Sequence, residues 1–347
     1  MPLFTSAPNS LCILRLSAIG DVCHAIAAVQ AIQRAWPQTK ITWITGKLEA
    51  QLLAHISNVQ VIVFDKKQGL KAYTSLYKTL KNQRFDALLH MQSALRSSMV
   101  SLLIKSPIKI GFDKERAKDA QWLFSNQKID KSNNPHVLDG FMGFVKKLGI
   151  NDTDVQWNIN IPLAATQKAK NIINGQKTFI ICPATSKAYK NWTKEGYLAL
   201  AKHALNLDYQ VLICGANTQT EHDFARYIID NTSPKCISLI GKTSLIELLA
   251  TIQQSDLILA PDTGPTHMAT MVATPVIGLY AHHNPKRTGP YGGLKNVISV
   301  YEQCIYHETG EKPDTLPWRA RVKDENAMQQ ISTSDVIDLF NKIIQKK

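Results

Sequence analysis

One stretch of the sequence decides the fold, and it reads Leu257-Ile258-Leu259-Ala260-Pro261-Asp262-Thr263-Gly264-Pro265-Thr266-His267-Met268-Ala269. An apolar strand leads into a tight polar turn, and a helix follows directly, with a proline in its first turn where a missing N–H costs nothing. The first N–H groups of such a helix have no partner within it and its dipole is positive there, so an anion is stabilised without a metal. The turn therefore predicts either a diphosphate site in an α/β protein or only a well-capped helix.

A second junction of the same kind lies near the N-terminus. An expected strand over residues 11–16 is followed by Ser17, Gly20, Asp21 and His24, and a helical pattern continues from there. Asp21 is thus expected beside a glycine at the carboxyl end of the first strand, which is where open parallel sheets bind their ligands. The simple alternative is that Asp21 only caps the helix.

The length of the chain favours two domains. Its 347 residues exceed one ordinary domain, and strand and helix patterns alternate in both halves. We therefore predict an α/β fold of two Rossmann-like, doubly wound parallel sheets that face each other across a cleft. The expected domains cover residues 1–165 and 166–325. A terminal helix is expected over 326–347, with packing against the N-terminal domain as one option.

The charge of the chain indicates what it binds. A net charge of +13 would attract anionic substrates or hold the protein at an anionic membrane surface. Basic residues gather locally, either as a binding surface or only as a solvated one, at Arg96, Lys105, Lys109, Lys114, Arg116 and Lys118. Elsewhere they are dispersed and match no nucleic-acid-binding motif, so nucleic acid is not an expected partner.

Two further features of the sequence indicate the cell compartment and the state of the cysteines. It has no apolar run of about 18 to 20 residues and no secretory signal pattern, so we expect a cytoplasmic protein. Its six cysteines form no CxxC pair and predict reduced thiols in the core, with no metal ligands among them.

Polar residues follow other expected strands of the second half. Thr185, Ser186 and Lys190 come after the first of these strands, and Lys190 could neutralise a departing diphosphate in place of a metal ion. Glu221 follows the next strand and could bind ribose hydroxyls, or it could only favour the dipole of its helix. The segment 241–245, which begins with Gly241, opens a later helix and could lie against a base or phosphate, but we favour the simpler role of Ser244 as the cap of that helix. No GxGxxG or GxxxxGK[ST] motif occurs, which disfavours nicotinamide chemistry and P-loop hydrolysis.

These segments carry a resemblance to a known family. The chain resembles glycosyltransferase family 9, the ADP-heptose:lipopolysaccharide heptosyltransferases, in residues 16–24, 111–118, 185–192 and 261–280. The most specific pair is Gly20-Asp21-Val22-Cys23-His24 with Asp262-Thr263-Gly264-Pro265-Thr266-His267. The chain departs from the family members that add the first heptose to lipid A at Ala27, where that group often has proline, and in an apparent insertion over residues 301–321. These departures concern the choice of acceptor rather than membership of the family.

The resemblance implies a GT-B fold that binds the donor nucleotide in its C-terminal half and a lipid-linked acceptor in its N-terminal half. It implies that Asp21 is the general base. The donor site would include Thr185, Ser186, Lys190, Glu221, Gly241, Asp262, Thr263, Gly264 and His267. The acceptor site would include Ser17, Gly20, His24, Arg96, Lys114 and Arg116.

The residues suit a single displacement. Asp21 would remove a proton from an acceptor hydroxyl as its oxygen attacks the anomeric carbon, while backbone amides and Lys190 stabilise the leaving diphosphate. One displacement inverts the anomeric centre, and no second carboxylate is evident for a double displacement. For His24 and His267 we favour a structural hydrogen bond over proton transfer.

The expected function is transfer of heptose from ADP-heptose to a Kdo-lipid A type acceptor at the inner face of the bacterial inner membrane, without metal or cofactor. Two alternatives stay open. One is a family 9 enzyme with another nucleotide-sugar donor or a protein acceptor. The other is a nucleotide-binding protein without catalytic activity.

Overall fold

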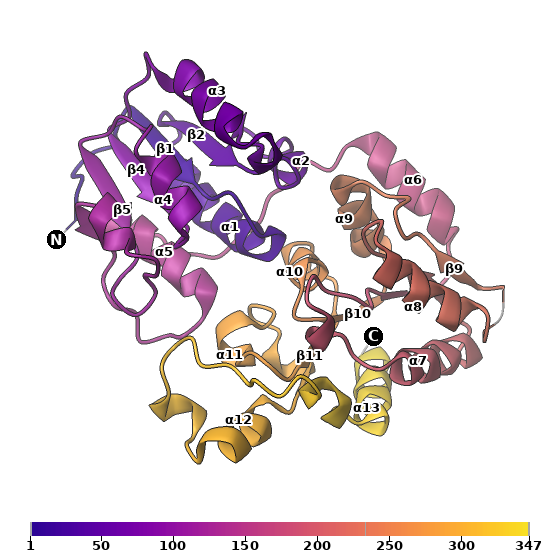
Figure 1. Cartoon of the computed structure of the whole chain (residues 1–347). Coiled ribbons are helices and arrows are strands. Elements are labelled where there is room, and N and C mark those ends of the chain that lie inside the picture. Colours follow the sequence, from indigo (N-terminus) through magenta and orange to yellow (C-terminus); the bar gives the residue numbers. More distant parts are fainter. Residues whose placement is uncertain (1, 233, 346–347) are drawn as a thin grey trace. The chain divides into compact units, whose positions relative to one another are not determined.

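The computed structural model describes residues 2–232 and 234–345, and it divides into two compact units, Met1–Asn160 and Ile161–Lys347. The predicted boundary near residue 165 thus lies a few residues earlier, in the extended segment before the first helix of the second unit. Each unit contains a parallel sheet that has six strands in the described part of the chain. This confirms the α/β class and the two doubly wound sheets that were expected (Figure 1).

The sheet of the N-terminal unit has the strand order β3-β2-β1-β4-β5-β6. Its strands are β1 (Ser10–Leu14), β2 (Lys40–Thr45), β3 (Val59–Val63), β4 (Ala87–His90), β5 (Ile108–Gly111) and β6 (Gln127–Lys128). Its helices are α1 (Ile19–Ala35), α2 (Ala50–Leu53), α3 (Leu70–Leu80), α4 (Leu95–Ser101) and α5 (Val137–Leu148), with 3₁₀ turns η1 (Lys66–Gln68) and η2 (Gln121–Phe124). Strands β1 and β4 are almost wholly buried, as expected of central strands covered on both faces.

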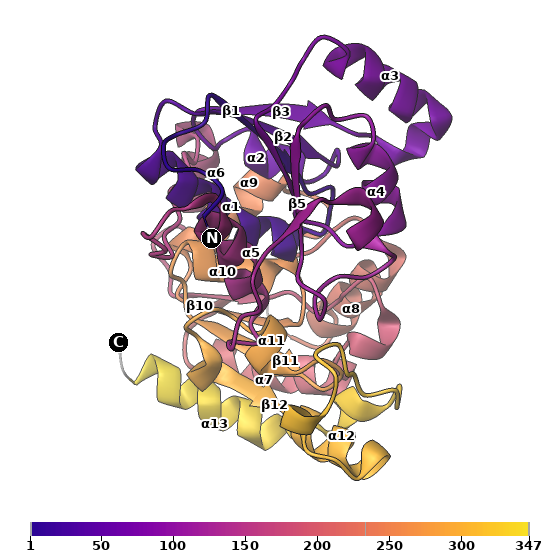
Figure 2. The same cartoon turned by 90° about the vertical axis from the view of Figure 1, so that its left-hand side faces the viewer.

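Helices cover both faces of this sheet. Figure 2 shows α3 and α4 on one face and α1 and α5 on the other. Leu76 and Leu80 of α3 share one apolar cluster with Val100 of α4, while α1 and α5 pack against each other.

The sheet of the C-terminal unit has the order β12-β11-β10-β7-β8-β9. Its strands are β7 (Thr178–Ile181), β8 (Gln210–Ile213), β9 (Cys236–Ser238), β10 (Leu257–Pro261), β11 (Val276–Tyr280) and β12 (Val297–Ser299). Its helices are α6 (Leu163–Ile173), α7 (Lys194–Asn206), α8 (Gln219–Ile229), α9 (Leu245–Gln254), α10 (Gly264–Met271), α11 (Pro285–Thr288), α12 (Tyr301–Thr309) and α13 (Thr333–Ile344). The 3₁₀ turns are η3 (Ala188–Lys190), η4 (Leu294–Asn296), η5 (Pro313–Thr315) and η6 (Ala327–Gln330).

The terminal helix α13 belongs to the C-terminal unit. Its buried residues Val336, Phe340 and Ile343 lie in the main apolar cluster of that unit. The ring of Phe340 packs edge-on against Phe179 of β7, with 5.1 Å between centroids. We named packing against the N-terminal domain as one option for residues 326–347. The structure instead shows the apolar side of α13 packed within the C-terminal unit.

The cysteines are reduced and buried. All six are free and buried, and burial raises the pKa of thiols such as Cys12 and Cys23 above their ordinary value. This confirms their role as small core residues. Among the residues that the structure describes, no helix is long and apolar enough to cross a membrane.

Candidate functional site

The turn between β10 and α10 leads directly into a helix, as the sequence predicted. Thr263 precedes α10 in an extended conformation, and its side chain does not cap the helix. The hydroxyl of Thr266 donates instead to the carbonyl of Pro261, at 2.8 Å, which holds the turn against the end of the strand. The simple alternative for this stretch was a well-capped helix. The structure shows no side-chain cap at Thr263, so this alternative does not explain the turn.

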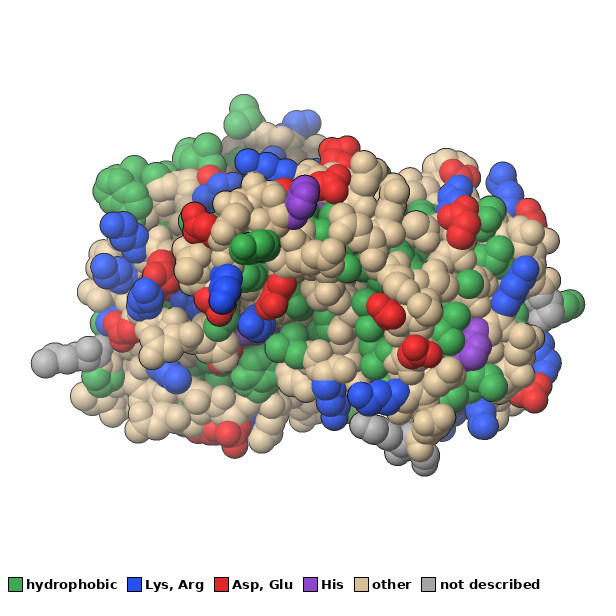
Figure 3. Space-filling view, turned by 90° about the horizontal axis from the view of Figure 1, so that it is seen from below, with side chains coloured by type: hydrophobic (Ala, Val, Ile, Leu, Met, Phe, Trp, Pro, Cys, Tyr) green, Lys and Arg blue, Asp and Glu red, His purple; other side chains and the backbone are tan. Residues whose placement is uncertain are grey.

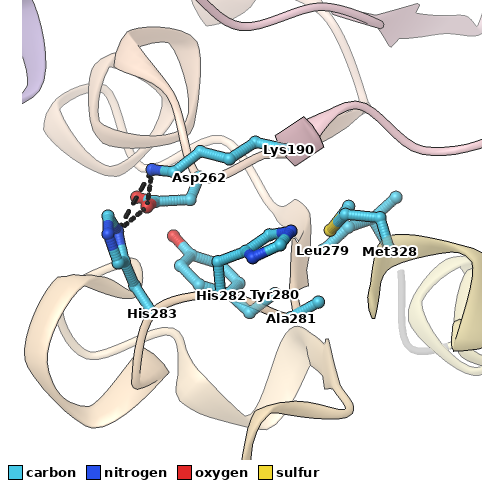
Figure 4. Close-up of a pocket in the computed structure, with 8 residues that line it drawn as sticks. All are labelled: Lys190, Asp262, Leu279, Tyr280, Ala281, His282, His283 and Met328. Atoms are coloured by element: carbon cyan, nitrogen blue, oxygen red, sulfur yellow. Dashed lines mark hydrogen bonds and ion pairs between the residues drawn. The ribbon is translucent and has the colours of Figure 1, made fainter. Parts of the chain in front are cut away.

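A compact charged cluster lies beside this turn. The carboxylate oxygen Oδ2 of Asp262 accepts hydrogen bonds from Lys190 Nζ and His283 Nδ1, each at 2.7 Å. The Lys190 and His283 nitrogens are themselves 3.1 Å apart. Figure 4 shows the three side chains converging on one point.

Sheet topology explains why these three residues meet. Lys190 follows β7, Asp262 follows β10 and His283 follows β11, and these strands are adjacent and parallel in the sheet. Their carboxyl ends therefore lie at the same edge, where α/β proteins bind ligands. Sequence analysis missed His283. The same rule would have found it, since it lies just beyond the strand that ends at Tyr280.

The cluster keeps Asp262 ionised. Burial by itself would raise the pKa of Asp262, but the hydrogen bond from His283 and the charge of Lys190 outweigh it and hold that pKa well below its ordinary value. Burial has the opposite consequence for the imidazole, because it lowers the pKa of His283 despite the neighbouring carboxylate. Near neutral pH the cluster thus consists of an ammonium, a carboxylate and a neutral imidazole, in which Nδ1–H donates to Asp262.

The cluster forms one wall of a small pocket. Its lining consists of Lys190, Asp262, Leu279, Tyr280, Ala281, His282, His283 and Met328 (Figure 4). His282 lies between two carbonyl oxygens, those of Tyr189 at 2.8 Å and Val322 at 3.2 Å. These bonds fix the loop that carries His283 and so position the cation of Lys190 at the edge of the sheet.

Other predicted donor residues lie at neighbouring strand ends. The loop after β7 is folded by a hydrogen bond from Thr185 N to Asn191 Oδ1, at 2.8 Å, and Ser186 is exposed on it. Gly241 adopts a positive φ of 68°, which favours glycine. His267 is buried on α10, and Gly264 begins that helix.

Glu221 has a structural task within its own loop. Its carboxylate accepts hydrogen bonds from Ala216 N at 2.8 Å and from the Thr218 hydroxyl at 2.6 Å. Gly215 lies against it, and a Cβ at that position would come within 2.5 Å of Oε1. The carboxylate therefore closes the turn between β8 and α8, whichever ligand lies beside it.

In the N-terminal unit, Asp21 is not the cap of its helix. Helix α1 begins at Ile19 with Ala18 at the cap position, so Asp21 lies in the first turn. Its side chain forms an ion pair with Arg15, the residue just beyond β1. The simple capping role considered for Asp21 is therefore wrong.

Arg15 is buried and held from several sides. Its guanidinium donates to the carbonyl of Met91, just beyond β4, at 2.6 Å, and lies over the ring of Phe141 at 5.5 Å. Burial lowers the pKa of Arg15, and the charge of Asp21 opposes this. Because Arg15 is fixed, it fixes one side of the Asp21 carboxylate, whose side chain is 35% exposed. Sequence analysis missed Arg15, although its position at the strand end is the same signal that selected Asp21.

Neighbouring acceptor candidates are held by a side chain that the sequence analysis also missed. Gln92, after β4, accepts from Leu16 N at 2.7 Å and donates to the Ser17 hydroxyl at 3.4 Å. Gly20 lies in the first turn of α1. His24 is buried on the same helix, with its ring edge-on to that of His136 at 5.2 Å.

The three predicted acceptor-binding cations differ in environment. Arg96 on α4 and Lys114 after β5 are exposed. Arg116 is buried, pairs with Asp113 at 3.1 Å and donates to the carbonyl of Asn134 at 2.8 Å. Its guanidinium thus stabilises the loop after β5.

Comparison with known proteins shows which family the chain resembles. The model of the family described as glycosyltransferase family 9 (heptosyltransferase) matches residues 73–315. The lipopolysaccharide core heptosyltransferase OpsX of Haemophilus influenzae is 46% identical over 344 residues, which are 99% of each chain.

Solved structures show the same fold. A glycosyl transferase of family 9 from Veillonella parvula has a TM-score of 0.80 at 19% identity and covers 98% of both chains. The E. coli heptosyltransferase WaaC with ADP has a TM-score of 0.75 at 20% identity and covers 96% of this chain and 99% of its own.

The two sheets have the GT-B fold of the heptosyltransferases among the solved structures. The chain belongs to glycosyltransferase family 9, the heptosyltransferases. It is therefore an enzyme, and the non-catalytic alternative no longer stands.

The charged cluster predicts a pH-dependent effect of Asp262→Asn. The folded chain lowers the pKa of Asp262, so its ionised form stabilises the fold. This contribution is complete above the ordinary carboxyl pKa of about 3.9 and is lost as the pH falls below it. We expect the variant to be less stable than the wild type by about 2 kcal/mol at pH 7, with the difference narrowing below about pH 4. Urea unfolding at pH 7, 5 and 3.5 measures it.

Asp338→Asn is the matched control, because Asp338 is exposed on α13 and should cost little at any of these pH values. A stability difference for Asp262→Asn that stays constant or grows as the pH falls would contradict the assigned ion pair.

Proposed function

We propose that this enzyme transfers heptose from ADP-heptose to the inner core of lipopolysaccharide, with a lipid A-linked acceptor of the Kdo-lipid A type. The observation that carries the proposal is the Lys190–Asp262–His283 cluster, which presents a fixed cation at the strand ends of a family 9 chain. The names of OpsX, a lipopolysaccharide core heptosyltransferase, and of WaaC, a heptosyltransferase with ADP, support the choice of donor and acceptor.

In the proposed reaction Asp21 is the general base. Its Oδ2 faces Arg15, so Oδ1 is the oxygen that we assign to the acceptor hydroxyl. As the hydroxyl oxygen attacks the anomeric carbon, its proton passes to Asp21 and the bond from that carbon to the diphosphate breaks. One such displacement inverts the configuration of the anomeric centre.

The leaving ADP takes up negative charge, which Lys190 and the first amides of α10 would stabilise. Asp262 holds Lys190 in place and His283 holds Asp262. Thr263, Gly264 and His267 would complete the diphosphate site, with Thr185, Ser186, Glu221 and Gly241 along the rest of the donor. Because Lys190 supplies the cation, we propose that the reaction needs no metal and no cofactor.

Acceptor binding is assigned to the N-terminal unit. Ser17, Gly20 and His24 surround Asp21 in sequence, and the exposed cations Arg96 and Lys114 suit the acidic sugar and phosphates of such an acceptor. We propose that Arg116 acts there by shaping the loop after β5. Because the proposed acceptor is linked to lipid, we also propose that the enzyme acts in the cytoplasm, at the anionic inner face of the inner membrane.

The proposed function predicts acceptor-dependent release of ADP. Purified enzyme with ADP-heptose should release ADP at a rate that rises at least a hundredfold when heptose-deficient Kdo-lipid A is added, because the hydroxyl that attacks is on that acceptor. A coupled assay for ADP measures this rate. A panel of other ADP- and UDP-sugars, and a protein acceptor, serves as the comparison. Faster release with any of these than with the proposed pair would assign a different substrate.

The metal-free mechanism predicts that EDTA leaves turnover unchanged. Enzyme treated with excess EDTA and passed through a desalting column should keep the full rate, since Lys190 rather than a bound ion neutralises the diphosphate. The same assay run with added magnesium is the control. If EDTA abolished turnover and magnesium restored it, the metal-free mechanism would be contradicted.

A further inference from the structure

A cluster of large apolar side chains lies exposed on the N-terminal unit, on elements other than the helix that carries Asp21. Helix α4 exposes Leu95 and Met99, and Leu102 directly after it is exposed as well. The adjacent 3₁₀ turn η2 exposes Trp122 and Leu123, at 70% and 64% of their surface. The two elements contact each other. We call these five residues the α4–η2 patch.

The patch is part of a well-fixed surface. Gln121, the buried first residue of η2, donates to the carbonyl of His90 at 2.8 Å and accepts from Phe112 N at 3.0 Å. At the start of α4, Leu95 N donates to Asp119 Oδ2 at 3.3 Å. The exposure of Trp122 and Leu123 is therefore imposed by hydrogen bonds on both sides of the patch and is not the result of a frayed end.

Single exposed apolar residues are ordinary on protein surfaces, whereas several gathered on contacting elements mark a surface for interaction. Here they include a tryptophan, which favours the boundary between water and lipid because its ring is apolar and its N–H is polar. Figure 3 shows hydrophobic side chains projecting at the upper left edge, on the side of the N-terminal unit, with Lys and Arg side chains nearby.

The charge of the residues around the patch indicates which kind of partner it binds. Residues 91–131 contain eight Lys and Arg but only four Asp and Glu. Six of these cations are exposed, namely Arg96, Lys105, Lys114, Lys118, Lys128 and Lys131, against three of the acids, namely Glu115, Asp119 and Asp130. Apolar side chains with a basic surround match a bilayer that carries anionic headgroups, since the side chains enter the interface while the cations meet the headgroups.

We propose that the α4–η2 patch is the surface by which this enzyme docks on an anionic lipid bilayer, with Trp122 and Leu123 entering the interface. The proposal rests on the proposed function in one respect, namely that the acceptor is linked to lipid. It adds which surface of the N-terminal unit faces the membrane, and it separates lipid contact at α4 and η2 from the chemistry at Asp21.

The test compares the wild type with the double variant Trp122→Ser/Leu123→Ser. Flotation with phosphatidylcholine vesicles that contain about 30% phosphatidylglycerol, an anionic lipid that gives them a negative surface potential, measures binding. We expect the double variant to bind at least tenfold more weakly, or about 1.4 kcal/mol. Wild-type binding should fall when phosphatidylglycerol is omitted or salt is raised.

Leu163→Ser/Leu294→Ser is the matched control, because it removes two exposed leucines from the C-terminal unit and should leave vesicle binding unchanged. Circular dichroism and ADP binding confirm that each variant is folded. Brominated lipids should quench the tryptophan fluorescence of the wild type more than that of Trp122→Phe.

Vesicle binding that is equal in the wild type and the double variant would overturn the proposal, as would a wild type that does not bind vesicles. A dimer in analytical ultracentrifugation that the double variant abolishes, with vesicle binding unchanged, would assign the patch to a second copy of the chain instead. The proposed function is tested separately by ADP release with a deacylated, water-soluble acceptor, on which the double variant should match the wild type. If neither protein released ADP in that assay while the wild type still bound vesicles, the proposed function would be contradicted and the docking proposal would stand.

Discussion

The ion pair between Asp262 and Lys190 is the interaction on which the charged cluster of the C-terminal unit depends. An ammonium at a strand end would ordinarily be solvated and mobile, but here a buried carboxylate fixes it, and His283 fixes that carboxylate in turn. The carboxylate stays ionised because two donors converge on one oxygen. The result is a cation held in place before any ligand arrives, which is the condition under which electrostatic stabilisation of a leaving group is most effective.

The N-terminal unit repeats the same physical arrangement with the charges exchanged. There the buried group is the cation, Arg15, held by the carbonyl of Met91, and the group of opposite charge that it fixes is the more exposed Asp21. In both units the partners come from the carboxyl ends of adjacent parallel strands, β1 and β4 in one case and β7, β10 and β11 in the other. Two sheets of the same kind thus position a fixed cation for the leaving group and a fixed carboxylate for the acceptor in our account.

Sequence reasoning predicted the elements that follow from local pattern. The apolar runs before Asp21 and Asp262 indicated buried parallel strands, and the polar turns after them indicated the two helices that the structure has at α1 and α10. It could not reveal partners that only the strand order brings together. Arg15 and His283 were therefore missed, and the burial of Arg116 against Asp113 was not expected. The destination of α13 was left open as well, since an apolar helical stripe shows that a helix packs but not on which surface.

The measurement that tests the central claim most directly compares Asp21→Asn with the wild type in single-turnover transfer from ADP-heptose, alongside the affinity of each for ADP. Our account predicts that the substitution lowers the rate of transfer by about 10²- to 10⁴-fold, the usual contribution of a general base, and leaves ADP affinity within a factor of two, because the donor cluster is in the other unit. Transfer at the wild-type rate would contradict the assignment of Asp21 as the base.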